Sequence, residues 1–106
     1  MKRGEIRWYE LPQPDKRRPV VVLTRDSAIE YLGEETIAPI STTIRDIPSE
    51  VLLTERDGVP RECAINLDHL QTVSRGRLGP LITTLDESKL EQLREALLFA
   101  MEFHDM

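Results

Sequence analysis

The chain has 106 residues and a net charge of −5, which leaves room for one hydrophobic core and gives no general attraction to nucleic-acid backbones. Hydrophobic residues make up 40% of the chain and charged residues 31%, a balance typical of a soluble globular domain. No segment predicts a membrane span and no N-terminal signal pattern is visible, so we expect a cytoplasmic protein in which residues 1–106 form a single domain.

Two strands and a helical turn are predicted near the N-terminus. Residues 3–11 alternate in polarity and place Ile6 and Trp8 on one face, the pattern of a half-buried strand. Residues 18–24 are apolar on both faces, so they predict a central strand. A helical turn is expected over residues 26–31.

The rest of the chain predicts short strands followed by one long helix. Strands are expected at residues 36–42, 50–54, 62–67 and 70–73, with a brief extended piece at 81–83. Pro39 cannot donate a backbone hydrogen bond, so it predicts an edge strand or a bulge. Residues 75–80 contain two glycines and a proline and predict a loop. Apolar residues at helical spacing predict a helix over about 86–104, begun by the N-cap Asp86.

The second half of this helix carries more apolar side chains than one core-facing stripe needs. Leu98 and Phe99 belong to this surplus. Two interpretations remain open, deep burial within the monomer and contact between two subunits. The elements together predict a mainly β fold of the α+β class, a small, mostly antiparallel barrel closed by the C-terminal helix.

The dipeptide Arg18-Pro19 is the strongest local indication of a binding site. It stands at the mouth of the predicted central strand, directly before Val20. Proline restricts the residue before it to an extended conformation, so the arginine side chain is oriented before any ligand binds. A guanidinium group stays charged and presents a rigid fork of donors that matches phosphate. The alternative interpretation is a solvated arginine at the end of a strand.

Metal and cofactor sites are not predicted. The sequence contains no Gly-rich phosphate loop and no Cys/His ligand spacing, and the two histidines, His69 and His104, are far apart. Cys63 is the single cysteine and has apolar neighbours, so we expect a buried, reduced thiol.

The ordered series of segments resembles the MazF/PemK toxin family, the endoribonucleases of bacterial toxin–antitoxin systems. Residues 2–8, 18–26 and 38–42 look like the family's first three strands, and 60–66, 70–73 and 77–78 look like the block usually read as Pro-Arg-Asp-Ser-Val, Thr-Ile and Arg-Leu. The resemblance continues through Leu85-Asp86 into the helix and so spans nearly the whole chain.

This resemblance implies an SH3-like barrel that forms a homodimer and cleaves single-stranded RNA at short sequences without a metal ion or cofactor. It also implies a cognate antitoxin of the MazE type, whose disordered tail lies across the active groove. The family's catalytic arginine corresponds to Arg18. Its hydroxyl residue, normally threonine, corresponds to Ser41, which is a departure; Thr42 would take this position only if the strand register shifted by one residue.

Further substrate-binding candidates come from the same comparison and from the basic residues beside the site. Arg17 precedes the catalytic arginine, Thr42 follows the hydroxyl residue, and Asp68 and His69 follow the fifth strand, where related toxins contact bases. A solvated turn is the alternative for the last two residues. Trp8 is expected in the core rather than as a stacking platform.

The chemistry expected from these residue types needs no nucleophile from the protein. The 2′-OH of RNA attacks the adjacent phosphate, and the enzyme stabilises the negative charge that develops. Arg18 would clamp the phosphate and protonate the departing 5′-oxygen, and Ser41 would bond a non-bridging oxygen. The products would be a 2′,3′-cyclic phosphate and a 5′-OH.

Two other functions share the predicted fold. One is a CcdB-like toxin that binds DNA gyrase without cutting a substrate, and the other is a family member that kept the fold and lost activity. Arg18-Pro19 and Ser41 favour the nuclease, because binding gyrase requires no phosphate clamp. The departure at Ser41, together with a first inter-strand loop shorter than in many relatives, keeps the inactive alternative open.

Overall fold

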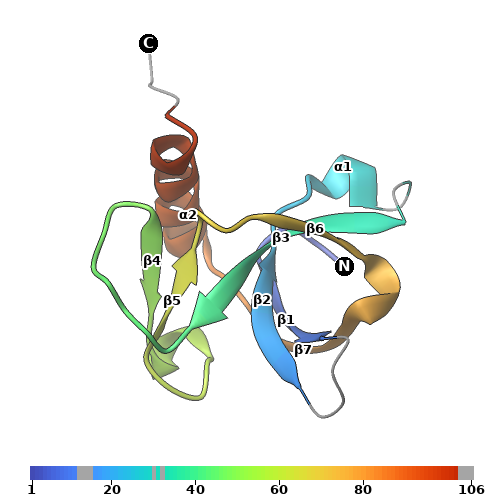
Figure 1. Cartoon of the computed structure of the whole chain (residues 1–106), viewed down its shortest axis with the longest axis horizontal. Coiled ribbons are helices and arrows are strands. Elements are labelled where there is room, and N and C mark those ends of the chain that lie inside the picture. The colour runs from blue at the N-terminus through green and yellow to red at the C-terminus, as the bar shows by residue number, and fades with distance from the viewer. Residues whose placement is uncertain (12–15, 30, 32, 103–106) are drawn as a thin grey trace.

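A computed structural model describes residues 1–11, 16–29, 31 and 33–102 of the chain. Its elements are β1 (Glu5–Glu10), β2 (Arg17–Val22), α1 (Asp26–Ile29), β3 (Glu34–Ser41), β4 (Glu50–Leu53), β5 (Cys63–Asn66), β6 (Gln71–Ser74), β7 (Leu78–Thr84) and α2 (Glu87–Ala100), with 3₁₀ helices at Glu55–Asp57 and Arg75–Arg77. All strand pairs are antiparallel, and α2 lies beside β4 and β5 (Figure 1). The predicted mainly β fold with a C-terminal helix is confirmed.

The strands follow the order β4-β5-β3-β2-β1-β7, with β6 paired to β3 off this path. Among the described residues, the path is therefore an open, barrel-like sheet with β4 and β7 at its two ends. β2 has neighbours on both sides, as predicted for a central strand. Its residues Val20 and Val21 belong to two different hydrophobic clusters, which explains why the strand is apolar on both faces.

The prediction that Pro39 marks an edge strand or a bulge is wrong. β3 pairs with β6 over Glu34–Ile37 and with β5 from Ile40 onward, and Pro39 itself pairs with Val20 of β2. The proline therefore lies between the ladders of β6 and β5, where its missing N–H removes no hydrogen bond from either strand.

The prediction of a loop over residues 75–80 is also wrong. A 3₁₀ helix covers Arg75–Arg77, and β7 then starts at Leu78 and pairs with β1. Glycine and proline are tolerated here because β7 ends the strand order and its register with β1 shifts twice, between Ile6 and Arg7 and between Arg7 and Tyr9.

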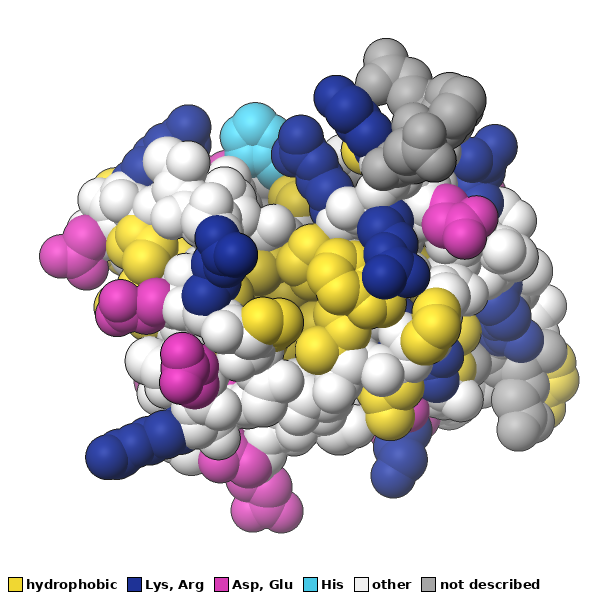
Figure 2. Space-filling view, turned by 90° about the horizontal axis from the view of Figure 1, so that it is seen from below, with side chains coloured by type: hydrophobic (Ala, Val, Ile, Leu, Met, Phe, Trp, Pro, Cys, Tyr) yellow, Lys and Arg dark blue, Asp and Glu magenta, His cyan; other side chains and the backbone are white. Residues whose placement is uncertain are grey.

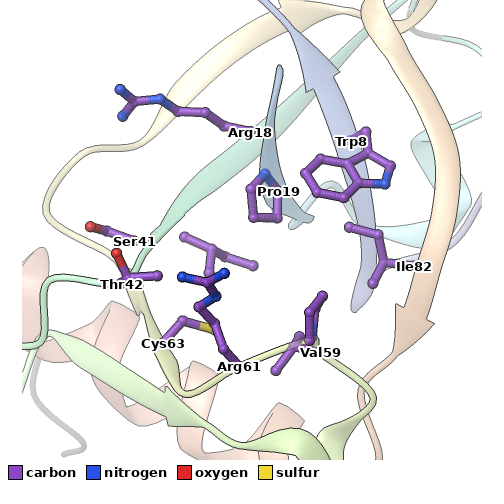
Figure 3. A pocket seen from close by; sticks show the side chains of 11 residues that line it. Trp8, Arg18, Pro19, Ser41, Thr42, Val59, Arg61, Cys63 and Ile82 are labelled. Carbon is purple, nitrogen blue, oxygen red and sulfur yellow. The ribbon is translucent and has the colours of Figure 1, made fainter. Parts of the chain in front are cut away.

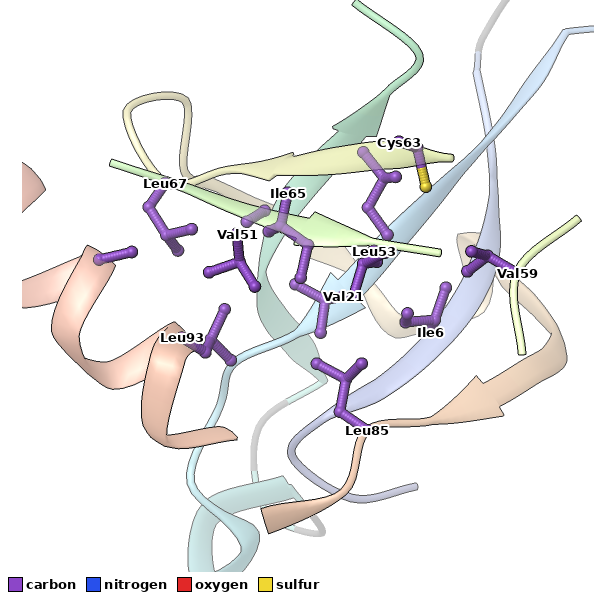
Figure 4. Close-up of a cluster of buried hydrophobic side chains, with 13 residues drawn as sticks. Ile6, Val21, Val51, Leu53, Val59, Cys63, Ile65, Leu67, Leu85 and Leu93 are labelled. Atoms are coloured by element: carbon purple, nitrogen blue, oxygen red, sulfur yellow. The ribbon is translucent and has the colours of Figure 1, made fainter. Parts of the chain in front are cut away.

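The main hydrophobic core lies between the sheet and α2 (Figure 4). Its buried members come from nearly every element: Ile6, Val21, Ala38, Ile40, Val51, Leu53, Val59, Cys63, Ile65, Leu67, Leu85, Leu93 and Ala96. A smaller cluster of Val20, Ile37 and Val73 lies on the other side of β2 and β3. This core fixes the ends of β2 and β3 relative to each other, which matters for the site described below.

The C-terminal helix is shorter than the predicted range of about 86–104. Asp86 is the N-cap as predicted, and its carboxylate accepts a hydrogen bond from the Lys89 backbone N–H (2.8 Å). α2 ends at Ala100, and residues 103–106 lie outside the described residues. Phe99 is 56% exposed, so burial within the monomer does not account for the surplus apolar surface.

Within the described ranges, no helix is both long and apolar enough to cross a membrane.

The connection between β4 and β5 is held in one conformation by a tight turn. Thr54 and Asp57 form a capping box around the 3₁₀ helix. The Asp57 carboxylate accepts a hydrogen bond from the Thr54 backbone N–H, and the Thr54 hydroxyl accepts one from the Arg56 backbone N–H. Gly58 then adopts φ = +96°, a conformation that favours glycine. The Thr83 hydroxyl donates to the Asp57 carbonyl (3.0 Å), which ties the connection to β7. The residues that follow Gly58 are thereby directed toward the ends of β1 and β2.

Candidate active site

A pocket of about 540 Å³ opens where the ends of β1, β2 and β3 meet the β4–β5 connection. It is lined by Trp8, Arg18, Pro19, Ile40, Ser41, Thr42, Val59, Pro60, Arg61, Cys63 and Ile82. These segments lie at the bottom of the view in Figure 1, and Figure 2 shows that side with apolar side chains in its centre and Lys and Arg side chains around them. The volume is in the usual range for ligand sites.

The charged and hydroxyl side chains gather mainly on one side of this pocket (Figure 3). In that view, Arg18, Ser41, Thr42 and Arg61 lie on one side, and Trp8, Pro19, Val59 and Ile82 lie on the other. The pocket therefore offers positive charge and hydroxyl groups next to an apolar surface. That combination suits an anionic ligand that also has a flat or apolar part.

Arg18 takes the position that the sequence predicts. It pairs with Tyr9 of β1 near the start of β2, its side chain is exposed, and Val20, two residues later, is buried. Among the described residues, no carboxylate lies within ion-pair distance of its guanidinium group. Its charge is therefore available to a ligand.

The two candidate hydroxyl residues both line the pocket. Ser41 is the last residue of β3 and pairs with Ala64 of β5. Because β3 ends there, the alternation of strand side chains no longer directs Thr42 to the opposite face. The Ser41 Oγ accepts a hydrogen bond from the backbone N–H of Thr43 (3.0 Å), which fixes the oxygen and leaves the hydroxyl hydrogen free to donate.

Arg17 does not line the pocket, but its side chain contacts Trp8, which does. Its guanidinium carbon lies 4.5 Å from the centroid of the Trp8 ring, a cation–π contact. Trp8 is half-buried and lines the pocket, so it is more than the core residue that the sequence predicts. The contact holds the indole ring in place at the apolar side of the pocket.

Asp68 and His69 do not line the pocket. The Asp68 carboxylate accepts a hydrogen bond from the buried Ser49 hydroxyl, and its backbone N–H donates to the Asn66 side chain (2.9 Å). These bonds give Asp68 a structural role in the turn after β5. His69 is exposed next to it, and contact of either residue with a base stays a prediction.

Sequence reasoning missed Arg61 as a site residue. The tight turn at Gly58 brings the β4–β5 connection over the pocket, so Arg61 lies in the same pocket as Arg18 and Ser41, which are distant from it in sequence. One feature of the sequence could have indicated Arg61 as a site residue. In Pro60-Arg61, as in Arg18-Pro19, an arginine stands directly beside a proline, whose ring restricts the backbone.

Cys63 confirms the prediction of a buried, reduced thiol. Its side chain lines the floor of the pocket and forms no disulfide. Burial, together with the charge of the Asp57 carboxylate, raises the pKa of the Cys63 thiol. The thiol therefore stays protonated at neutral pH and is a poor nucleophile. In the part of the chain that the structure describes, no group of three or more His, Cys, Asp or Glu side chains is placed to hold a metal ion.

A family of bacterial toxins matches nearly the whole of this chain. The family model of the PemK-like, MazF-like toxins of type II toxin–antitoxin systems matches residues 2–101. The chain belongs to this family. The family match confirms the prediction, made from the segments between residue 2 and the C-terminal helix, that the chain is a member of the MazF/PemK family.

Curated relatives from Mycobacterium tuberculosis match this toxin over most of their length. Probable endoribonuclease MazF5 is 41% identical over 101 residues, which cover 94% of this chain and 92% of that protein. Endoribonuclease MazF3 is 35% identical over 92 residues, which cover 87% and 89%. The predicted enzyme class agrees with the names of these relatives.

Solved structures confirm the fold of this toxin. The Mycobacterium tuberculosis toxin MazF-mt6 aligns with a TM-score of 0.86 at 33% identity and covers 95% of this chain and 99% of that one. A mycobacterial endoribonuclease in complex with its cognate antitoxin aligns with a TM-score of 0.88 and covers 100% and 99%. Its 18% identity shows a shared fold alone.

Proposed function

We propose that this toxin is a sequence-specific endoribonuclease that cleaves single-stranded RNA without a metal ion, leaving a 2′,3′-cyclic phosphate and a 5′-OH. The family and the names of the relatives support the enzyme class. The observation that carries the chemistry is the pocket itself, which both Arg18 and Ser41 line beside an apolar surface, with no ion pair to Arg18 among the described residues.

The reaction follows from the chemistry of RNA and from these two side chains. The 2′-oxygen of the substrate loses its proton to water and forms a bond to the adjacent phosphorus, while the bond from phosphorus to the 5′-oxygen breaks and that oxygen takes up a proton. Extra negative charge develops on the non-bridging oxygens during this step. A charged donor fixed in the pocket stabilises this charge more than it stabilises the bound substrate, and so lowers the barrier.

Ser41 is arranged to act as a hydrogen-bond donor in this step. One lone pair of its oxygen is engaged by the Thr43 N–H, so the hydroxyl hydrogen can point toward a non-bridging phosphate oxygen. Because the serine lacks the methyl group of threonine, its side-chain torsion is less restricted. The hydrogen bond from Thr43 compensates for part of this lost restriction.

Arg18 supplies both charge and a proton in this proposal. Its guanidinium fork can hold two phosphate oxygens at once, which orients the phosphorus for attack by the 2′-oxygen. A guanidinium group is protonated at neutral pH, and the departing 5′-oxygen, as an alkoxide, is a stronger base than a neutral guanidine, so Arg18 can pass it a proton.

Two partners complete the proposal. An antitoxin with an acidic or apolar tail would cover the pocket and neutralise Arg18, as suits a family in which a toxin homologue has been solved with its cognate antitoxin. A second copy of the chain would bind through the exposed apolar surface around Leu98 and Phe99 at the end of α2. Such a homodimer would remove this surface from water.

The test is cleavage of a long single-stranded RNA by the purified protein in the presence of EDTA. We expect fragments with 5′-OH ends and no change when magnesium is added. Loss of activity in EDTA that magnesium or manganese restores would contradict the proposal, as would 5′-phosphate ends. A folded protein that leaves RNA intact under all these conditions would favour an inactive family member.

A further inference from the structure

The pocket holds a second arginine, Arg61, which pairs with no carboxylate of the described residues. Among the described residues, neither Arg18 nor Arg61 makes an ion pair, although other arginines of the chain do. Arg7 is paired with Glu5 (2.9 Å) and Arg75 with Glu35 (3.0 Å). In a chain with a net charge of −5, two guanidinium groups in one pocket, without an ion pair to any described residue, indicate a ligand with more than one negative charge.

The position of Arg61 is fixed by its backbone rather than by partners of its side chain. The preceding turn is held by the capping box at Thr54 and by the bond from Thr83 to the Asp57 carbonyl. Pro60 then restricts the backbone directly before Arg61. The side chain itself is exposed and, within the described part of the chain, makes no hydrogen bond, so its donors are free for a ligand.

Between the two arginines, the pocket offers both hydroxyls and a flat apolar surface. Figure 3 shows Ser41 and Thr42 on the side of the two guanidinium groups, and Trp8 across the pocket from them. Single-stranded RNA has this alternation of phosphate and base, and proteins that read it place aromatic side chains against unstacked bases. The Trp8 ring lines the pocket and can take such a base on the face that Arg17 does not cover.

We infer that Arg61 is a second phosphate-binding residue, which holds a phosphate next to the scissile one and keeps the intervening base against the apolar side of the pocket. The inference rests on the proposed function, because Arg18 is taken to hold the scissile phosphate. Arg61 binds substrate in this arrangement and does not take part in the transfer of the proton. Its loss should therefore weaken binding more than it slows the chemical step.

Arg61→Ala tests this inference with Arg56→Ala as its matched control. Arg56 carries the same charge, is exposed, and belongs to the same β4–β5 connection, but it does not line the pocket. The binding probe is a fluorescent single-stranded oligodeoxynucleotide, which has no 2′-OH and is not cut by the proposed reaction. Its affinity is measured over a series of salt concentrations, and steady-state cleavage of an RNA of the same sequence is measured in parallel.

We expect Arg61→Ala to weaken binding about 10- to 100-fold, the effect of losing a hydrogen bond to a charged group. The slope of log affinity against log salt should fall by about 0.7, the contribution of one phosphate contact on a single strand. KM for RNA should rise while kcat stays within about twofold. Arg61→Lys should keep the slope and recover part of the affinity, because it keeps the charge and loses the fork.

Three results would overturn the inference. One is an Arg61→Ala variant with unchanged affinity and salt slope, and another is an Arg56→Ala variant with the same losses. The third is a wild-type protein that does not bind the oligodeoxynucleotide. The proposed function fails separately, if wild-type protein binds the probe in an Arg61-dependent manner and yet leaves RNA intact.

Discussion

Replacing Arg18 with alanine should abolish most of the activity while leaving the stability of the fold unchanged. The side chain is exposed and, among the described residues, has no ion-pair partner, so truncation breaks no ion pair. Exposed substitutions of this kind change the free energy of unfolding by about 0.5 kcal/mol or less. A structural role and a catalytic role are therefore separable at this position.

The expected loss of rate follows from the charge that develops on the phosphate. Removing one fixed donor from such a site costs on the order of 3 kcal/mol, or a hundredfold to a thousandfold in rate. Arg18 provides a charge and two donors, so its loss should reach the upper end of this range. Ser41→Ala removes a single hydroxyl and should cost less. Arg18→Lys should fall between wild type and alanine, since the charge remains and the fork is lost.

The assay is single-turnover cleavage of RNA at saturating enzyme, combined with urea unfolding of each variant. A folded Arg18→Ala protein with near wild-type cleavage would refute this reasoning and show that the active site lies elsewhere. So would a loss of rate that parallels a loss of stability. If Thr42→Ala is damaging and Ser41→Ala is not, the hydroxyl role belongs to Thr42.

Three further predictions concern the core, the thiol and the subunit contact. Arg75→Ala should lower the free energy of unfolding by about 3 kcal/mol, because it leaves the fully buried Glu35 carboxylate without its cation. Urea unfolding measures this change, and a value below about 1 kcal/mol would contradict the prediction. Cys63, whose pKa is raised, should react with iodoacetamide at pH 7.5 far more slowly in the native protein than in guanidinium chloride, and equal rates would show an accessible thiolate. Phe99→Asp should convert a dimer into a monomer in light scattering without loss of helix content, and an unchanged dimer mass would place the interface elsewhere.

The sequence predicted most of the fold because most strands carry their own local pattern. Val20 and its neighbours are apolar on both faces, and the strand they form is central. The failures at Pro39 and at residues 75–80 have a common cause. Pro39 lies where β3 changes its partner from β6 to β5, and Gly79 and Pro80 lie in β7, the last strand of the sheet order. Both outcomes depend on pairing between segments that are distant in sequence.

The candidate site was predictable where local backbone chemistry orients a side chain. Arg18 follows from Arg18-Pro19 alone, and Ser41 follows from the resemblance of β3 to the family's third strand. Arg61 and Trp8 could not be assigned in this way, because their approach depends on how the β4–β5 connection folds back over β1. The burial of Glu35 was equally hidden, since its partner Arg75 is 40 residues away.

The measurement that tests the central claim most directly uses an RNA with a single 2′-deoxynucleotide on the 5′ side of the mapped cut. If the substrate's own 2′-OH is the nucleophile, this one missing oxygen should abolish cleavage at that position, while binding to the pocket stays within a few-fold of the all-ribose RNA. Continued cleavage of the modified strand, with a 5′-phosphate at the new end, would show that water attacks instead and would contradict the account.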